Sequence, residues 1–268
     1  MPIYIKENPD YLAQSLDSIL DKQSIKPTEI IIVQDGPITS DIKNVLDHYC
    51  NLYPTLFRCY QLEKNMGMGY AMNFGLYKCN YDWVFRMDSD DIAKPNRFEK
   101  QIQIINQKKY DVIGSSIGEF NQCIGDINQL RIMPQNHSDI IKMMTYRNPI
   151  NHMTVAFKKE LAISAGGYWD KRFFEDYNLW YEMFKIKATF YNINEVLVDA
   201  RIGNNMLYRR SGYQYFLYEL HLLQKFKGDG FINTFQFSVF FIMKLSARII
   251  PVSILKGVYK YFLRSKKK

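Results

Sequence analysis

The stretch that decides the fold is an apolar run ending in four polar residues, Trp83-Val84-Phe85-Arg86-Met87-Asp88-Ser89-Asp90-Asp91. A short apolar run bounded by polar residues predicts a buried strand over residues 83–87. The carboxylates then emerge at the carboxyl end of that strand. Open α/β sheets bind their ligands at this end of their strands, so the stretch predicts a ligand site there.

Two of these carboxylates are placed to act together. Alternate side chains of an extended segment share a face, so Asp88 and Asp90 point the same way. Their mutual repulsion is relieved by a hard divalent cation. Mg²⁺ or Mn²⁺ commonly binds one or two carboxylates together with the phosphates of a substrate. The four residues alone also fit an acidic turn after a strand, because acidic residues are common turn formers.

Strands and helices alternate along the chain around this stretch. The order predicts an α/β fold with a Rossmann-like, mostly parallel central sheet and flanking helices. Only Ile3-Tyr4-Ile5 precedes the first helix, a very short first strand that suggests a start codon placed too late or a shortened gene. Strands are expected at 29–35, 57–62, 111–117 and 153–157, and helices at about 9–20, 39–50, 65–78, 95–107 and from Glu175 onward.

The composition narrows the class of protein. With 268 residues, 47% of them hydrophobic, the chain is expected to be globular, with one large domain or a domain and an appendage. The four cysteines lack C-x-x-C spacing, which indicates neither a zinc site nor a disulfide framework. No charged segment followed by an apolar one opens the sequence, so we expect a cytoplasmic protein.

Positive charge is concentrated in the last quarter of the chain. Residues 201–268 hold 13 Lys and Arg against two acidic residues, whereas the net charge of the whole chain is +8. Aromatic residues are interleaved with these cations. No apolar run there reaches the roughly 20 residues of a membrane-spanning helix, so we predict amphipathic helices, divided at Pro251, that lie on a membrane surface. A helical subdomain with a solvated basic end is the alternative, and no recognition motif favours nucleic-acid binding.

Six short motifs together resemble the family 2 glycosyltransferases of the glycosyltransferase A fold, particularly the bacterial branch that builds capsule, exopolysaccharide and O-antigen units. They occur in the family's order over roughly residues 1–210. The motifs are Met1-Pro2-Ile3-Tyr4, Ile31-Ile32-Val33-Gln34-Asp35-Gly36, Asn65-Met66-Gly67 with Ala71-Met72-Asn73, Arg86 to Asp91, Asn151-His152, and Phe174-Glu175-Asp176-Tyr177-Asn178-Leu179-Trp180.

The resemblance implies a donor site for a nucleotide sugar. Asp88 and Asp90 correspond to the family's DXD element, with Asp90 as the direct ligand of Mn²⁺ or Mg²⁺ and Asp88 near the ribose or a metal-bound water. Asp35 is expected to accept a hydrogen bond from the base, although a turn or cap role also fits this residue. The remaining residues expected around the nucleotide are Pro2, Tyr4, Asn65, Gly67 and Asn73.

The resemblance also implies an acid pair for catalysis. Adjacent residues on a helix diverge by about 100°, so Glu175 and Asp176 should not both reach one hydroxyl. We expect Asp176 to be the general base and Glu175 to be an acid at the helix start, favoured by the helix dipole. Gly203 stands where many relatives have a histidine, which removes one possible metal ligand. Possible contacts to the acceptor or to a diphosphate are His152, Arg201, Arg209 and Arg210.

These expectations lead to a specific functional hypothesis. Residues 1–210 would form a catalytic domain, and residues 211–268 a basic aromatic tail. The resemblance implies a metal-dependent, inverting, non-processive transfer of one sugar, from a UDP or similar donor to a polyprenyl-diphosphate-linked saccharide. This would occur at the cytoplasmic side of the bacterial inner membrane. A sugar-nucleotide pyrophosphorylase is less favoured because its Gly-rich, basic phosphate loop is missing, and a non-catalytic membrane-associated scaffold of the same fold stays open.

Overall fold

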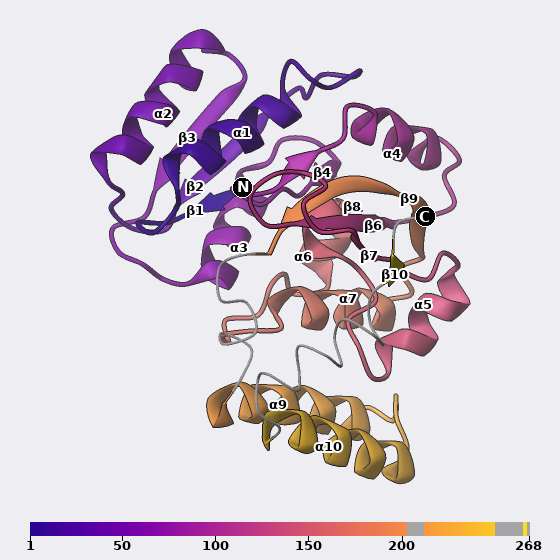
Figure 1. The fold of residues 1–268 in the computed structure, drawn as a ribbon. Coiled ribbons are helices and arrows are strands. Elements are labelled where there is room, and N and C mark those ends of the chain that lie inside the picture. Colours follow the sequence, from indigo (N-terminus) through magenta and orange to yellow (C-terminus); the bar gives the residue numbers. More distant parts are fainter. Residues whose placement is uncertain (203–211, 250–264, 267–268) are drawn as a thin grey trace.

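The computed structural model describes residues 1–202, 212–249 and 265–266, and it shows an α/β fold with helices flanking curved sheets (Figure 1). The first elements are β1 (Pro2–Ile3), α1 (Pro9–Ile19), β2 (Ile30–Gln34), α2 (Ser40–Leu52), β3 (Phe57–Gln61), α3 (Met68–Lys78), β4 (Trp83–Phe85), β5 (Ile92–Ala93) and α4 (Arg97–Ile105). They are followed by β6 (Val112–Phe120), β7 (Gln129–Arg131), α5 (His137–Met144), the 3₁₀ turn η1 (His152–Thr154), β8 (Ala156–Lys158), α6 (Lys159–Ser164), α7 (Glu175–Lys185), β9 (Phe190–Arg201), α9 (Tyr213–Gly228), α10 (Thr234–Ile249) and β10 (Ser265–Lys266).

Local sequence signals explain the first helices. The side chain of Asn8 accepts the backbone N–H groups of Asp10 and Tyr11, which caps α1, and Pro9 occupies the first helical position. Thr39 caps α2 by accepting the N–H of Ile42. Both helices begin and end close to the expected residues. The strand expected at 153–157 begins later, because residues 152–154 form the turn η1.

The strands form two hydrogen-bonded sheets. The first sheet, β1–β2–β3, is entirely parallel, as expected from the alternating order. In the second sheet β6 and β9 are parallel, whereas β6 pairs with β7 and with β8 in the antiparallel sense, as do β4 with β8 and β5 with β9. The parallel pairing expected from the sequence therefore holds for β1–β2–β3 and for the pair β6–β9. A short connection, residues 121–128, returns the chain from β6 to β7, which produces antiparallel pairing.

An apolar cavity separates the two sheets beside β1. Strand β1 pairs only with Val33 and Gln34, so it ends before it can cover the rest of β2. Neither Asp90 nor Asp176 lines this cavity, and we do not assign it to the substrate. Its walls come from β2, α3, β4 with Arg86 after it, β8 and the loop before α7, and they include Val33, Leu76, Val84, Arg86, Phe157 and Tyr168.

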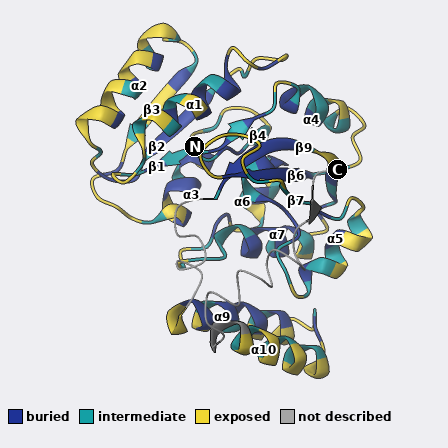
Figure 2. Ribbon diagram, viewed as in Figure 1, coloured by how far each residue is buried: buried dark blue, intermediate teal, exposed yellow. Residues whose placement is uncertain are grey.

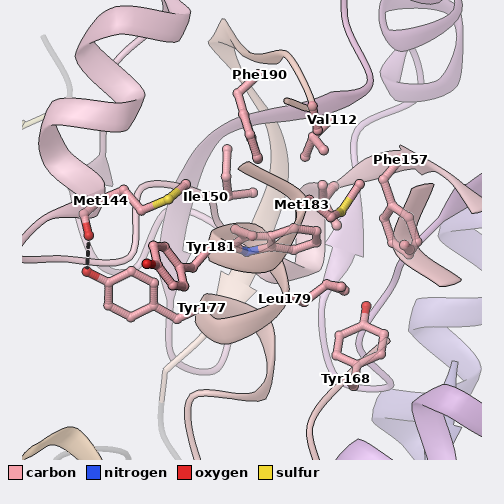
Figure 3. Packing of buried hydrophobic residues seen from close by; sticks show 14 of the residues in the cluster. Val112, Met144, Ile150, Phe157, Tyr168, Tyr177, Leu179, Tyr181, Met183 and Phe190 are labelled. Carbon is pink, nitrogen blue, oxygen red and sulfur yellow. Dashed lines mark hydrogen bonds between the residues drawn. The ribbon is translucent and has the colours of Figure 1, made fainter. Parts of the chain in front are cut away.

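Two main apolar cores hold the layers together. One core packs α1 and α2 against the first sheet and includes the fully buried Leu12, Leu16 and Ile32. The larger core surrounds Trp180 of α7, a buried side chain whose ring packs against that of Phe157. Figure 3 shows members of this core, among them Phe157, Met183 and Phe190. Figure 2 shows that β6 and β9 are buried along most of their length, so they form the centre of the molecule.

Helices α9 and α10 lie side by side beneath α7 (Figure 1). Phe226 of α9 packs against Tyr181 of α7, with 4.3 Å between ring centroids. Helices α9 and α10 are separated by residues 229–233. The division expected at Pro251 lies outside the described residues. Among those described, no helix has the length and apolar character needed to cross a membrane.

Candidate active site

The acidic segment lies at the carboxyl end of β4 and leads into β5. Ser15 of α1 donates its hydroxyl to the carbonyl oxygen of Asp88 at 2.7 Å, and Ser89 donates its hydroxyl to Glu7 at 2.7 Å. The carboxylate of Asp88 forms an ion pair with Arg86, whose side chain is 6% exposed. The segment is therefore fixed in place by contacts from α1, from the loop before it and from β4.

Asp91 differs from its neighbours because it points into the protein. The residue is 2% exposed, and its carboxylate accepts the backbone N–H of Arg201 in β9 at 2.8 Å. Burial, together with the charges of Asp88 and Asp90, raises the pKa of Asp91 well above its ordinary value. Asp91 thus supports the segment from within and does not face a ligand.

Arg201 lies directly behind the acidic segment. Its Nε donates to the carbonyl oxygen of Asp90 at 3.1 Å. The other guanidinium nitrogens donate to the carbonyl oxygens of Asn121 and Gln122, both at 3.2 Å, and to the side chain of Gln14 at 2.9 Å. These contacts support a positioning role for Arg201. The direct contact with an acceptor or diphosphate that the sequence suggested stays a prediction.

Asp90 is half-buried, and its electrostatic environment suits a cation. Burial, followed by the nearby charge of Asp88, raises the pKa of Asp90 to about 6. Two carboxylates that disfavour each other's ionisation are stabilised by a divalent ion placed between them and a phosphate. The residues therefore fit Mn²⁺ or Mg²⁺. No group of three or more His, Cys, Asp and Glu side chains suited to a metal ion occurs in the described part of the chain, so substrate and water oxygens would complete the coordination.

Asp35 lies at the end of β2, where its carboxylate organises the start of α3. It accepts the backbone N–H of Met66 at 2.6 Å and that of Gly67 at 3.0 Å. Gly36 has a φ of 90°, and an added Cβ would lie 2.7 Å from the backbone nitrogen of Asn65, so only glycine fits there. The recognition of a base by Asp35 stays a prediction, since the protein contacts of its carboxylate are with this loop.

The other residues expected around the nucleotide divide into two groups. Pro2 in β1 pairs with Val33 of β2, and Tyr4 follows β1. The side-chain amide of Asn65 donates to the carbonyl oxygen of Asp35 at 3.3 Å. These residues therefore lie along the edge of the first sheet where β1 and β2 end. Asn73 is further along α3. Its amide donates to the carbonyl oxygen of Tyr168 at 2.5 Å and accepts the backbone N–H of Tyr168 at 2.7 Å. Asn73 thus ties α3 to the loop before α7.

The acid pair begins α7 after two residues with unusual backbones. Phe173 and Phe174 have φ values of 67° and 59°, in the left-handed region that side chains other than glycine rarely adopt. Glu175 accepts the N–H of Phe173 at 3.0 Å, and burial raises the pKa of Glu175 to about 7. Asp176 accepts a hydrogen bond from the side-chain amide of Asn148 at 2.7 Å. The two carboxylates therefore have different partners, as their divergence on a helix predicts.

Tyr168 connects the acid pair with the acidic segment. Its hydroxyl lies 3.0 Å from Nε2 of His152. Burial raises the pKa of Tyr168, the charge of Arg86 opposes this rise, and the charges of Asp176 and Asp88 add to it. Burial, with the charge of Arg86, holds the pKa of His152 well below its ordinary value. His152 is thus a neutral group within this cluster.

Three residues of the site were not singled out from the sequence. Arg86 could have been found from the sequence, since it stands two positions before Asp88 and could pair with it in an extended segment. Tyr168 and Asn148 gave no signal, because they lie in irregular connections between the motifs and no local pattern marks them. Arg209 and Arg210 lie outside the described residues.

An α/β sheet with carboxylates gathered at its strand ends defines the class of the protein. Its fold is similar to that of Staphylococcus aureus TarS 1-349, solved in complex with UDP-GlcNAc, with a TM-score of 0.65 at 17% identity over 91% of this chain and 70% of that chain. A mannosyltransferase, PcManGT, from Pyrobaculum calidifontis, solved in complex with GDP-Man and Mn²⁺, gives 0.60 at 12% identity over 96% and 77%. The fold is thus the glycosyltransferase A fold.

Sequence comparison places the chain more narrowly. Residues 1–166 match glycosyl transferase family 2, and the chain belongs to this family of enzymes. It is 38% identical to an uncharacterized glycosyltransferase of Haemophilus influenzae, over 98% of this chain and 97% of that protein. It is also 36% identical to the UDP-Gal:alpha-D-GlcNAc-diphosphoundecaprenol beta-1,3-galactosyltransferase of Escherichia coli, over 98% and 95%. The family expected from the six motifs is therefore confirmed.

Proposed function

We propose that the protein is a metal-dependent, inverting glycosyltransferase that moves one sugar from a UDP-linked donor to a lipid-linked saccharide in bacterial surface polysaccharide biosynthesis. The observation that carries this proposal is the family match over residues 1–166 in a fold that places Asp35 and Asp88 after β2 and β4 and Asp176 in the first turn of α7. A transferase needs a donor group and an acceptor group within reach of one sugar.

The donor side supplies binding and orientation. Asp90 and Asp88 would hold a divalent cation, which when bound supplies positive charge for the leaving diphosphate. Arg201 and Ser15 hold the backbone of this segment, so its carboxylates keep their position while the donor binds. The edge formed by Tyr4, Asp35 and Asn65 is placed to contact the base and ribose.

The acceptor side supplies a base. Asp176 would take the proton of the acceptor hydroxyl while the oxygen of that hydroxyl bonds to the anomeric carbon and the bond from this carbon to the diphosphate oxygen breaks. A single displacement of this kind inverts the anomeric configuration. The carboxylate of Asp176 accepts the side-chain amide of Asn148 at 2.7 Å and the backbone N–H of Tyr177 at 2.8 Å, and these two hydrogen bonds fix its orientation.

The acceptor class is supported by one relative and by the carboxyl-terminal helices. The Escherichia coli relative is named for a diphosphoundecaprenol-linked acceptor. On α10, Phe235 and Ile242 are 76% and 62% exposed, and they share a face with the exposed Val239 and Met243 (Figure 2). An exposed apolar stripe on a basic helical unit suits the surface of an anionic bilayer. We therefore propose peripheral binding at the cytoplasmic side of the inner membrane.

A panel of nucleotide sugars with a lipid-linked acceptor tests the proposal. We expect transfer from one UDP-sugar in the presence of Mn²⁺ or Mg²⁺, loss of transfer with EDTA, and loss in Asp90→Asn. Thr39→Ala, at the cap of α2, serves as a control that should keep transfer. A non-catalytic scaffold of the same fold would bind vesicles but release no UDP with any donor, and that result would overturn the proposal.

A further inference from the structure

The loop between α6 and α7, residues 165–174, connects the donor side of the site with α9. At one end the side chain of Asn73 in α3 holds both backbone groups of Tyr168. The next residue, Trp169, contacts His221 of α9, with 6.0 Å between ring centroids. The acid pair follows this loop directly. Its position is therefore set by contacts from two sides of the molecule.

The last two residues of the loop adopt a strained backbone. Left-handed φ values for residues other than glycine cost about 1–3 kcal/mol each, and they persist only when surrounding contacts impose them. Phe173 and Phe174 adopt such values in succession, immediately before Glu175. Phe174 is also the residue that caps α7, and its side chain makes no capping hydrogen bond. Two hydrogen bonds hold the backbone of Phe173, whose N–H donates to Glu175 at 3.0 Å and whose carbonyl oxygen accepts the indole N–H of Trp169 at 2.9 Å, and the side chains of Phe173 and Phe174 make further contacts.

The rings of Phe173 and Phe174 both pack against Tyr215 of α9. The centroid of Tyr215 lies 4.9 Å from the centroid of Phe173 and 4.9 Å from that of Phe174. Tyr218, one turn further along α9, adds a second contact to Phe173 at 5.9 Å. Tyr215 is buried, so its ring fills the space beneath the strained pair.

We propose that Tyr215 is a positioning residue for the acid pair: it holds Phe173 and Phe174 in their left-handed conformation and thereby fixes Glu175 and Asp176 at the first turn of α7. This inference rests on the proposed function for its catalytic meaning. It makes α9 part of the catalytic apparatus and not only a carrier for the tail. Packing contacts then connect the carboxyl-terminal helices α9 and α10 with the proposed base, Asp176.

Other contacts keep α9 in place when the Tyr215 ring is removed. Lys225 donates to the side chain of Asn178 at 2.7 Å and forms an ion pair with Glu182. Phe226 packs against Tyr181 two turns further along α7. A substitution at Tyr215 should therefore alter the start of α7 and leave the attachment of the helix intact.

The test compares three variants of the full chain. In Tyr215→Ala we expect kcat for transfer to fall by roughly tenfold to a hundredfold, with KM for the donor unchanged, because misplacement of a base affects the chemical step. Tyr215→Phe, which keeps the ring, should restore most of kcat. Tyr213→Ala removes a ring that is 73% exposed on the same helix and should match the parent protein. An unchanged kcat in Tyr215→Ala would overturn the proposal, as would equal losses in kcat and donor affinity.

Amide hydrogen exchange separates this inference from the proposed function. The N–H of Asn178 donates to the carbonyl oxygen of Phe174 at 2.9 Å, and we expect its exchange to accelerate in Tyr215→Ala but not in Tyr213→Ala. If the parent protein transfers no sugar, the proposed function fails while this measurement still decides whether Tyr215 orders the turn. If Tyr215→Ala does not fold, Tyr215→Leu keeps the bulk without the ring. Unchanged exchange at Asn178 would overturn the inference.

Discussion

The donor edge and the acid pair hold their carboxylates in different ways. Asp35 is bound by the N–H groups of Met66 and Gly67, in a tight turn that only glycine at position 36 permits. Asp176 is held by Asn148, which is 28 residues away, and by a strained turn packed on α9. The donor edge is thus held by backbone N–H groups of a turn 31 residues away, whereas the acid pair is held by side chains, namely an amide 28 residues away and the rings packed on α9. Substitutions that test each region should therefore differ in effect.

The largest effect is expected on the donor side. Asp90→Asn should lower kcat for metal-dependent transfer by about a thousandfold, or about 4 kcal/mol, because a charged ligand is removed where charge develops. Thermal unfolding of the metal-free protein should be unchanged or slightly higher, since the mutual repulsion of Asp88 and Asp90 is relieved. Steady-state kinetics over a Mn²⁺ titration and calorimetry measure both. Activity within tenfold of the parent would show that Asp90 is not the ligand.

A smaller loss is expected when the base loses its orientation. Asn148→Ala should lower kcat by roughly tenfold to a hundredfold with little change in KM for the donor, because Asp176 loses a fixed partner. Thr145→Ala, at an exposed position at the end of α5, is the matched control. Transfer assays at saturating donor measure the change. A rise in donor KM at constant kcat would place Asn148 in donor binding.

Removal of the hydrogen bonds by which Arg201 supports the acidic segment should mainly lower the stability of the protein. Arg201→Lys keeps the charge but cannot form the fork that donates to the carbonyl oxygens of Asp90, Asn121 and Gln122. We expect the free energy of unfolding to fall by about 2 kcal/mol, because these partly buried hydrogen bonds are lost. Urea unfolding measures this loss. A variant with unchanged stability but no activity would instead support direct contact with the substrate.

The smallest effect concerns pH. Glu175 has a folded-state pKa of about 7, above its ordinary value of 4.5, so the folded state binds the extra proton and stability falls as pH rises through this interval. Glu175→Gln should remove this fall and should be more stable than the parent at pH 8, by on the order of 1 kcal/mol. Unfolding curves at pH 5 and pH 8 test the sign. A larger gain at pH 5 than at pH 8 would contradict the assigned burial.

Sequence alone settled the parts of this protein that depend on short-range rules. Alternating strands and helices, the cap at Asn8 and the acidic segment after the strand at 83–87 could be predicted, because each depends on residues within a few positions of one another. The family followed from six such motifs in order. Tertiary structure alone decided the antiparallel pairs of the second sheet, the inward turn of Asp91, the hydrogen bond from Asn148 to Asp176, and the packing of Tyr215 under the acid pair. These contacts join segments tens of residues apart, and no local propensity encodes which side chains meet when separate elements pack.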